Sequence, residues 1–334
     1  MRSIDVIVPC YRYAHYLREC VSSVLAERDL AVRVIIIDDC SPDNTPEVAE
    51  QLAREDARVT YRRHTANLRH IATYNEGIAW LEADYMLLLS ADDYMFPGAL
   101  RQAVDFMEAH PTVGFIYGRA VLTPNSGLKE APAGETSVSN VWKLKSGLDF
   151  MNEVAAGGAI NPVHTPTAVV RTRLLKQVGG YRPELPHSGD MEMWLRLAAH
   201  ADVAEFDGYL AVWRRHESNM QFEYYRKDYG VADLTQRRAA IDWVFKEYGT
   251  QIENSAALRS RLLAPLANEA LMHASGAFND AQVEVLSQLI EFALAANPEV
   301  KRTGRWKLLA LKQCVGMRLW RAFYTPTARL LGRA

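Results

Sequence analysis

The sequence has little cysteine and no long apolar run. Its four cysteines form no Cys-x-x-Cys pair and no cluster with histidine at zinc spacing. The first apolar stretch, residues 4–8, is shorter than a signal-peptide core, and no run approaches the roughly 20 residues of a transmembrane helix. These features argue against a disulfide-stapled secreted domain and a membrane span, and predict a cytoplasmic protein with free thiols.

A strong excess of charge of one sign is also missing. The 38 Lys and Arg residues nearly balance the 40 Asp and Glu residues, which argues against a general nucleic-acid-binding protein. An apolar share of 49% is typical of a soluble globular chain and excludes a mainly disordered or fibrous one. A length of 334 residues predicts one large domain with an appendage.

The charges are unevenly distributed along the chain. Residues 301–334 contain nine Lys or Arg and no Asp or Glu, which leaves 29 basic and 40 acidic residues before them. Within 305–323 the pattern predicts an amphipathic helix. Its apolar face consists of Leu308, Leu311, Val315, Leu319 and Ala322. We expect residues 302–334 to bind an anionic membrane surface, or alternatively to pack on the acidic body or on a second subunit of a homo-oligomer.

Three common nucleotide or hydrolase motifs are missing as well. The first predicted strand is followed by residues 9–13 (PCYRY) rather than by G-x-G-x-x-G, and neither a P-loop nor a G-x-S-x-G elbow occurs. A sugar-nucleotide pyrophosphorylase, another class of protein that binds nucleotides on a similar sheet, would begin with a glycine-rich phosphate loop, which this sequence lacks. These absences argue against dinucleotide, ATP and serine-hydrolase sites.

The first half of the sequence alternates apolar strands with helices. This pattern predicts an α/β fold with a mostly parallel sheet that helices flank on both faces. The expected strands are 4–9, 32–37, 59–62, 85–89, 115–117 and 210–215, and the expected helices are 16–26, 46–54, 74–81, 148–155, 171–178 and 191–200. Residues 122–141 read as a loop. Beyond about 225 only helical patterns remain, with interruptions expected at Pro265 and Pro298.

Two of the expected strands end in adjacent aspartates. Asp38 and Asp39 follow one strand, and Asp92 and Asp93 follow another. Ligands of such sheets bind at the carboxyl ends of the strands. Asp39 could bind a base or a ribose, and Asp92 could ligate a divalent cation beside a diphosphate. The alternative is that these aspartates only form turns and helix caps.

Seven motifs in this order resemble family 2 glycosyltransferases, which have a GT-A fold. The motifs are residues 5–11 (DVIVPCY), 34–45 (VIIIDDCSPDNT), 75–78 (NEGI), 89–93 (LSADD), 178–181 (VGGY), 189–196 (GDMEMWLR) and 214–216 (RRH). The resemblance covers about residues 3–220. It implies a Rossmann-like GT-A domain over 1–224, followed by a helical C-terminal region over 225–334.

The resemblance also implies roles for single residues. Asp39 corresponds to the residue that contacts the nucleotide base, and Asp190 to the catalytic base. Asp92 corresponds to the metal-contacting aspartate of the D-x-D motif, and His216 to a late histidine that approaches the diphosphate or the metal. The remaining expected donor-binding residues are Pro9, Tyr11, Asn67, Ser90 and Ala91. Ser90 stands where most relatives have the first aspartate of D-x-D.

The resemblance therefore implies an inverting glycosyltransferase that uses Mn²⁺ or Mg²⁺. Its donor would be a nucleoside-diphosphate sugar, UDP- or dTDP-linked, and its acceptor a glycan or a lipid-linked glycan of cell-surface polysaccharide synthesis. The alternatives are a catalytically inactive nucleotide-sugar-binding or scaffold protein, which Ser90 and Gly189 would permit, and a nucleotidyltransferase. For Asp190 the alternative is capping of the following helix.

Overall fold

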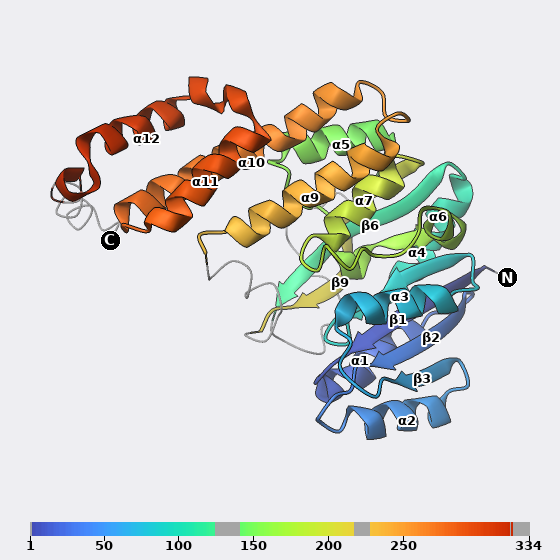
Figure 1. Cartoon of the computed structure of the whole chain (residues 1–334). Coiled ribbons are helices and arrows are strands. Elements are labelled where there is room, and N and C mark those ends of the chain that lie inside the picture. The colour runs from blue at the N-terminus through green and yellow to red at the C-terminus, as the bar shows by residue number, and fades with distance from the viewer. Residues whose placement is uncertain (1, 124–140, 217–227, 321, 323–334) are drawn as a thin grey trace. The chain divides into compact units, whose positions relative to one another are not determined.

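The computed structural model describes residues 2–123, 141–216, 228–320 and 322 (Figure 1). The chain divides into two compact units. The first comprises Met1–Met151 and Asn161–Glu217, and the second comprises Asn152–Ile160 and Ser218–Ala334. Most of the loop expected at 122–141 lies outside the described residues.

The first half of the sheet in unit 1 is parallel. Its strands are β1 (Ser3–Cys10), β2 (Ala31–Asp38), β3 (Val59–Arg63) and β4 (Tyr85–Leu88), in the order β3-β2-β1-β4. Helices α1 (Ala14–Leu25), α2 (Thr45–Glu55) and α3 (His70–Trp80) connect them. The β-branched run at 34–37 is fully buried, as expected for a strand covered on both faces.

The second half of the sheet mixes strand directions. The path continues through β8 (Val169–Arg171), β6 (Val113–Thr123), β9 (Asp202–Arg214) and β5 (Tyr94–Met95), and β7 (Trp142–Lys145) pairs with β9. Strand β8 runs antiparallel to both β4 and β6, whereas β6 and β9 are parallel. The remaining elements of this region are α4 (Ala99–Ala109), α5 (Gly147–Ala156), the 3₁₀ helix η1 (Thr165–Thr167), α6 (Thr172–Val178) and α7 (Gly189–Ala198). The predicted α/β fold with a flanked, largely parallel sheet is confirmed.

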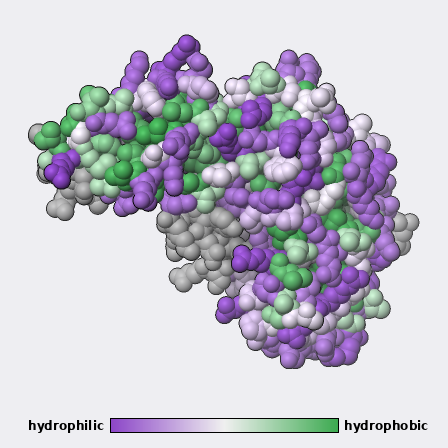
Figure 2. Space-filling view, in the orientation of Figure 1, coloured by the Kyte–Doolittle hydropathy of each residue, from purple (hydrophilic) through white to green (hydrophobic). Residues whose placement is uncertain are grey.

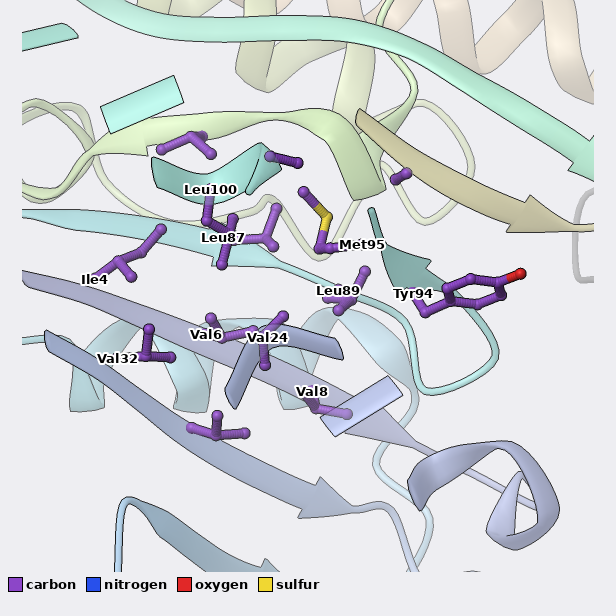
Figure 3. Close-up of a cluster of buried hydrophobic side chains, with 14 of the residues drawn as sticks. Ile4, Val6, Val8, Val24, Val32, Leu87, Leu89, Tyr94, Met95 and Leu100 are labelled. Atoms are coloured by element: carbon purple, nitrogen blue, oxygen red, sulfur yellow. The ribbon is translucent and has the colours of Figure 1, made fainter. Parts of the chain in front are cut away.

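The main core of unit 1 lies between the sheet and helices α1 and α4. Val6 of β1, Val24 of α1 and Leu87 of β4 belong to one buried cluster with Leu100 of α4 (Figure 3). The cluster continues along β1 to Val8, the residue before Pro9. Burial therefore fixes the carboxyl end of β1, where the polar residues of the candidate site begin.

Unit 2 is helical in its described part. Its elements are α9 (Val231–Tyr248), α10 (Ser255–Asn279), α11 (Val283–Ala296), the 3₁₀ helix η2 (Pro298–Arg302) and α12 (Gly304–Val315). Pro298 starts a new element, but the interruption predicted at Pro265 is wrong, because Pro265 lies inside α10. Leu262 and Leu266 are fully buried on either side of it, so packing outweighs the hydrogen bond that proline cannot donate.

The C-terminal helix differs from its prediction. It ends at Val315, because Gly316 adopts a positive φ of 83°, so the single helix expected over 305–323 is broken. Leu309 and Lys312 are its buried side chains. The exposed apolar side chains of this segment are Leu308, Leu311, Val315 and Leu319. Figure 2 shows hydrophobic residues on the surface of the helical unit. Among the described helices, none combines the length and apolarity needed to cross a membrane.

Candidate active site

The end of β1 holds two loops in place. The carbonyl oxygen of Cys10 accepts a hydrogen bond from the amide of Asp39 at 2.9 Å, and the carbonyl oxygen of Pro9 accepts one from Ala91 at 3.3 Å. Asp39 and Asp92 are both buried. The two acidic strand ends found in the sequence therefore flank the same strand end, as the parallel order β2-β1-β4 requires.

Asp39 has two hydrogen-bond partners, and both contact the same oxygen. Its Oδ1 lies 2.8 Å from Nδ1 of His64 and accepts a bond from the amide of Leu68 at 2.7 Å. The other ring nitrogen of His64, Nε2, lies 2.8 Å from Oε2 of Glu76. His64 and Glu76 were not predicted as site residues. His64 directly follows β3, so its place at the end of a parallel strand was the signal that could have identified it.

The expected base-pocket residues differ in exposure. Tyr11 is 41% exposed and Pro9 is half-buried, so both are accessible next to Asp39. Asn67 is exposed, and its side-chain oxygen accepts a hydrogen bond from the amide of Arg69 at 3.1 Å. Asn67 thus stabilises a turn in this structure.

Ser90 and Ala91 form the turn that precedes the second acidic pair. The carbonyl oxygen of Ser90 accepts the amide of Asp93 at 2.9 Å, and Ala91 is fully buried. Ser90 replaces a carboxylate, so this turn presents only the acidic side chains of Asp92 and Asp93.

His216 reaches Asp92 across the site. Its Nε2 lies 3.1 Å from Oδ2 of Asp92, and its ring contacts the rings of Tyr13 and Tyr16 with centroid distances of 5.4 and 5.9 Å. The structure thus brings together the two residues predicted to contact a metal, although they are 124 positions apart.

A buried arginine supports this pair. Arg214 is fully buried, donates hydrogen bonds from its guanidinium to the carbonyl of Asp92 and to Glu19, and from its amide to Oδ1 of Asp93 at 2.9 Å. Burial and the charge of Asp92 raise the pKa of Asp93 well above its usual range. Arg214 balances these charges and also stacks over Tyr16 at 4.4 Å. No role was predicted for Arg214 from the sequence.

Asp190 lies in the first turn of α7. Its Oδ2 accepts a hydrogen bond from Oγ1 of Thr165 at 2.6 Å, and its carboxylate also interacts with the hydroxyl of Tyr181. Burial raises the pKa of Asp190, and the two hydrogen bonds oppose that rise. The capping residue of α7 is Ser188, so the alternative that Asp190 is the N-cap is wrong.

Two tyrosines link Asp190 to Asp92. The rings of Tyr181 and Tyr74 are 5.2 Å apart. Burial raises the pKa of Tyr74, and the charges of Asp190, Asp92 and Asp93 raise it further. Asn75 exchanges two hydrogen bonds with the backbone of Tyr181, at 2.7 and 2.8 Å. The charges of Asp190 and Asp92 therefore both act on the hydroxyl of Tyr74, and Asn75 helps to hold the neighbouring Tyr181.

The neighbouring motif residues are structural. Glu192 and Arg196 form an ion pair one helical turn apart, at 2.8 Å, and both side chains are buried. Arg196 also donates to the carbonyls of Val178 and Gly180 at 2.7 and 2.8 Å. Trp194 is buried and stacks on Phe115, so it belongs to the core.

The donor atoms fit a cation that is shared with a phosphate ligand. Within the described part of the chain, no three His, Cys, Asp or Glu side chains form a metal-binding group. Asp92 and His216 offer one carboxylate and one imidazole. Mg²⁺ and Mn²⁺ commonly take one or two protein ligands and complete their shell with phosphate oxygens and water. These residues therefore suit a cation that arrives with a diphosphate.

Unit 1 combines three chemical capabilities, two at the end of β1 and one at the start of α7. Asp39 accepts a hydrogen bond from an N–H or O–H group, Asp92 and His216 can face a cation and phosphate, and Asp190 can accept a proton. A nucleoside diphosphate and a hydroxyl compound are the ligands that use all three.

Comparison with known families gives a match over half of the chain. Residues 5–178 match the family described as glycosyl transferase family 2. An uncharacterized glycosyltransferase of Haemophilus influenzae is 22% identical over 261 residues, which cover 76% of this chain and 79% of that protein. An uncharacterized glycosyltransferase of a Nostoc species is 30% identical over 122 residues, 36% of this chain and 38% of that protein.

Solved structures show the same fold. Residues 1–349 of S. aureus TarS match with a TM-score of 0.66 at 18% identity, covering 99% of this chain and 92% of that one. The same TarS fragment in complex with UDP-GlcNAc matches with a TM-score of 0.57 at 15% identity, over 90% of this chain and 92% of that one. The mannosyltransferase PcManGT of Pyrobaculum calidifontis, in complex with GDP-Man and Mn²⁺, matches with a TM-score of 0.53 at 17% identity. The match covers 96% of this chain and 83% of that one.

Proposed function

Because the chain belongs to glycosyl transferase family 2 and has the GT-A fold, we propose that its residues 1–224 catalyse an inverting sugar transfer. The donor is a nucleoside-diphosphate sugar and the acceptor is a hydroxyl group. The observation that carries the proposal is that Asp39 and the pair Asp92–His216 flank the end of β1, while Asp190 and Asp92 both act electrostatically on Tyr74.

The donor site supports a base with an N–H group at its pairing edge. Asp39 is an acceptor, and uracil, thymine and guanine each offer an N–H to it, whereas cytosine offers a lone pair there; the smaller pyrimidines are the choice that the resemblance implies. We therefore propose a UDP- or dTDP-sugar. The TarS fragment described above binds UDP-GlcNAc, which agrees with this choice, and PcManGT binds GDP-Man.

A divalent cation is proposed to accompany the diphosphate. Asp92 would hold Mn²⁺ or Mg²⁺, with His216 beside it, and the cation supplies positive charge against the leaving diphosphate when bound. The resemblance places Ser90, a hydroxyl, where a second carboxylate is common, so phosphate oxygens would have to supply more of the ligands of a bound cation. Mn²⁺ affinity should accordingly be low in the absence of nucleotide.

Asp190 is proposed to act as the general base. Its raised pKa makes it a better proton acceptor than an ordinary aspartate, while Thr165 and Tyr181 keep it oriented and partly ionised. It removes the proton of the acceptor hydroxyl as that oxygen attacks the anomeric carbon. The transition state is oxocarbenium-like, and holding both substrates at one site lowers the barrier further.

The acceptor is proposed to be a glycan or a lipid-linked glycan of cell-surface polysaccharide synthesis. The support lies in residues 302–334, which carry no acidic residue and expose Leu308, Leu311 and Leu319. Such a segment suits an anionic membrane surface, where lipid-linked acceptors are found. Packing of the same residues on a second copy of the chain is the alternative.

The decisive experiment is a donor screen followed by a transfer assay. Purified protein is mixed with UDP-, dTDP- and GDP-sugars with and without Mn²⁺, and thermal shift identifies those that bind. Hydrolysis or transfer from the radiolabelled best binder supports the proposal, and pyrophosphate release would indicate a nucleotidyltransferase instead. Binding without turnover over a broad acceptor set would favour an inactive nucleotide-sugar-binding protein.

A further inference from the structure

His64 lies between two carboxylates. Its Nδ1 is 2.8 Å from Oδ1 of Asp39, and its Nε2 is 2.8 Å from Oε2 of Glu76. The ring is only 8% exposed, whereas the carboxylate of Glu76 is 32% exposed. Because each ring nitrogen lies within hydrogen-bond distance of a carboxylate oxygen, the contacts restrict the protonation state of the imidazole.

A neutral imidazole does not satisfy this geometry while both carboxylates are ionised. It carries one N–H, so its other nitrogen would direct a lone pair at a carboxylate oxygen. An imidazolium donates to both carboxylates. Burial alone would lower the pKa of His64, but the hydrogen bonds to Asp39 and Glu76 outweigh burial and raise it. The charged form is therefore the one that fits.

Other charges nearby do not provide a second cation for Asp39. On β3, Arg62 contacts the other oxygen of Glu76 at 3.4 Å, and Arg63 contacts Asp38 at 3.3 Å. Apart from His64, the group in the described part of the chain that hydrogen-bonds to the carboxylate of Asp39 is the backbone amide of Leu68. Within the described residues, Oδ2 of Asp39 has no hydrogen-bond partner.

We propose that His64, as an imidazolium held by Glu76, is a positioning residue that fixes Oδ1 of Asp39 so that Oδ2 faces the N–H group of the donor's base. The inference rests on the proposed function and deepens it, since it assigns base selection to the three-residue relay Glu76–His64–Asp39. When His64 loses its proton, a single N–H remains for two carboxylates, and Asp39 is no longer held rigidly.

The sign of the pH dependence follows from the raised pKa. Affinity for a base with an imide N–H is complete while His64 is charged, and it falls as pH rises through the raised pKa. Replacing Glu76 by Gln removes one of the stabilising charges. That variant should therefore lose affinity at a lower pH than the wild type does.

The first test measures the binding of UDP, GDP and CDP by calorimetry between about pH 6.5 and about pH 8.5, in the range where histidine titrates. Both N–H groups of a glutamine side chain are on one nitrogen, so H64Q cannot bridge the two carboxylates as the imidazolium does. We expect it to bind UDP or GDP about tenfold more weakly at the acidic end, to lose the pH dependence and to discriminate less against CDP. The control H110Q removes a histidine that stacks on Phe106 and should bind like the wild type.

The second test observes the proton directly by ¹⁵N-histidine NMR of the full chain, with His64 assigned by through-bond correlation to its neighbours in the sequence. We expect both ring nitrogens of His64 to remain protonated above the usual pKa, and E76Q to lower that midpoint. E76Q changes a partly exposed side chain and keeps its shape, so it tests the relay even if H64Q does not fold.

Two results would overturn the proposal. One is UDP or GDP binding by folded H64Q with wild-type affinity and pH profile, and the other is a His64 midpoint at the usual value that E76Q does not move. If the wild type itself bound none of the nucleotides at any pH, the proposed function would fail, and this role with it. If instead the wild type binds nucleotide and only H64Q or E76Q differs from it, the proposed function stands and the result concerns the role of His64 alone.

Discussion

At the residue scale, the burial of Asp190 lowers stability at neutral pH and would favour its proposed role as the base. A carboxylate with a raised folded-state pKa stabilises the fold only while it is protonated, below its ordinary pKa. That contribution is lost as pH rises through the raised value, so at neutral pH the ionised side chain is a cost to folding. The raised pKa that causes this loss of stability also makes the ionised carboxylate a stronger proton acceptor.

We predict that D190N separates the two effects. Asparagine cannot accept the proton, so kcat should fall by at least about 10²–10⁴-fold. Donor affinity, measured by calorimetry, should stay near that of the wild type, and the melting temperature at neutral pH should rise. A fully active D190N enzyme would contradict the assignment of the base.

The hydrogen bond from Thr165 to Asp190 gives a second prediction. The rate should fall on acidification, as Asp190 takes up a proton at its raised pKa. T165V removes a donor that favours the ionised carboxylate, so the acid limb of the kcat/KM profile should move to higher pH. The control T167V changes the neighbouring buried hydroxyl that bonds to Gly118 and should leave the midpoint in place.

At the scale of elements, α3 packs unusually close to β1. A Cβ atom added at Gly77 would lie 2.3 Å from Cγ2 of Ile7, which is fully buried. This close approach keeps Asn75 and Glu76 near the residues they hold. The glycine of the NEGI motif thus has a packing function.

We predict that G77A destabilises the protein by about 1–3 kcal/mol through overpacking. Urea unfolding with an unchanged slope would measure the loss. G304A is a matched control, since a Cβ there meets nothing within 4 Å, and it should unfold at the wild-type urea concentration. Equal midpoints for G77A and the wild type would show that α3 can move away from β1.

The sequence predicted the elements whose signals are local. Strands β1, β2 and β4 are apolar and long enough to identify, and the two acidic pairs mark their ends. Strand β5 has two residues and β8 has three, so both depend on pairing with distant strands rather than on composition. The roles of His64 and Arg214 arise from contacts 25 and more than 120 positions away, which no local pattern reveals.

At the scale of the whole molecule, charge is segregated along the chain. The acidic first 300 residues and the basic last 34 residues give the protein two electrostatically different parts. The described part of the basic region exposes leucines together with Arg305 and Lys307. Attraction to anionic lipid should weaken with salt, whereas apolar insertion should not.

We predict that replacing Leu308 and Leu311 together by Asp abolishes sedimentation with vesicles containing anionic lipid and leaves nucleotide binding intact. Both side chains are about half exposed, so the fold should tolerate the change. Met272→Asp, at an equally exposed site on α10, is the control. Retained vesicle binding would contradict the membrane role, and loss of an oligomer instead would indicate a subunit contact.

The phenols around Asp190 and Asp92 have a consequence for enzymology. Burial is the largest cause of the raised pKa of Tyr13, Tyr74 and Tyr181, and adjacent carboxylates add to it. These hydroxyls consequently keep their protons in any buffer in which the enzyme would be assayed. An alkaline decline in turnover would therefore have to be traced to groups other than these three phenols, such as an imidazole, the nucleotide or a bound ion.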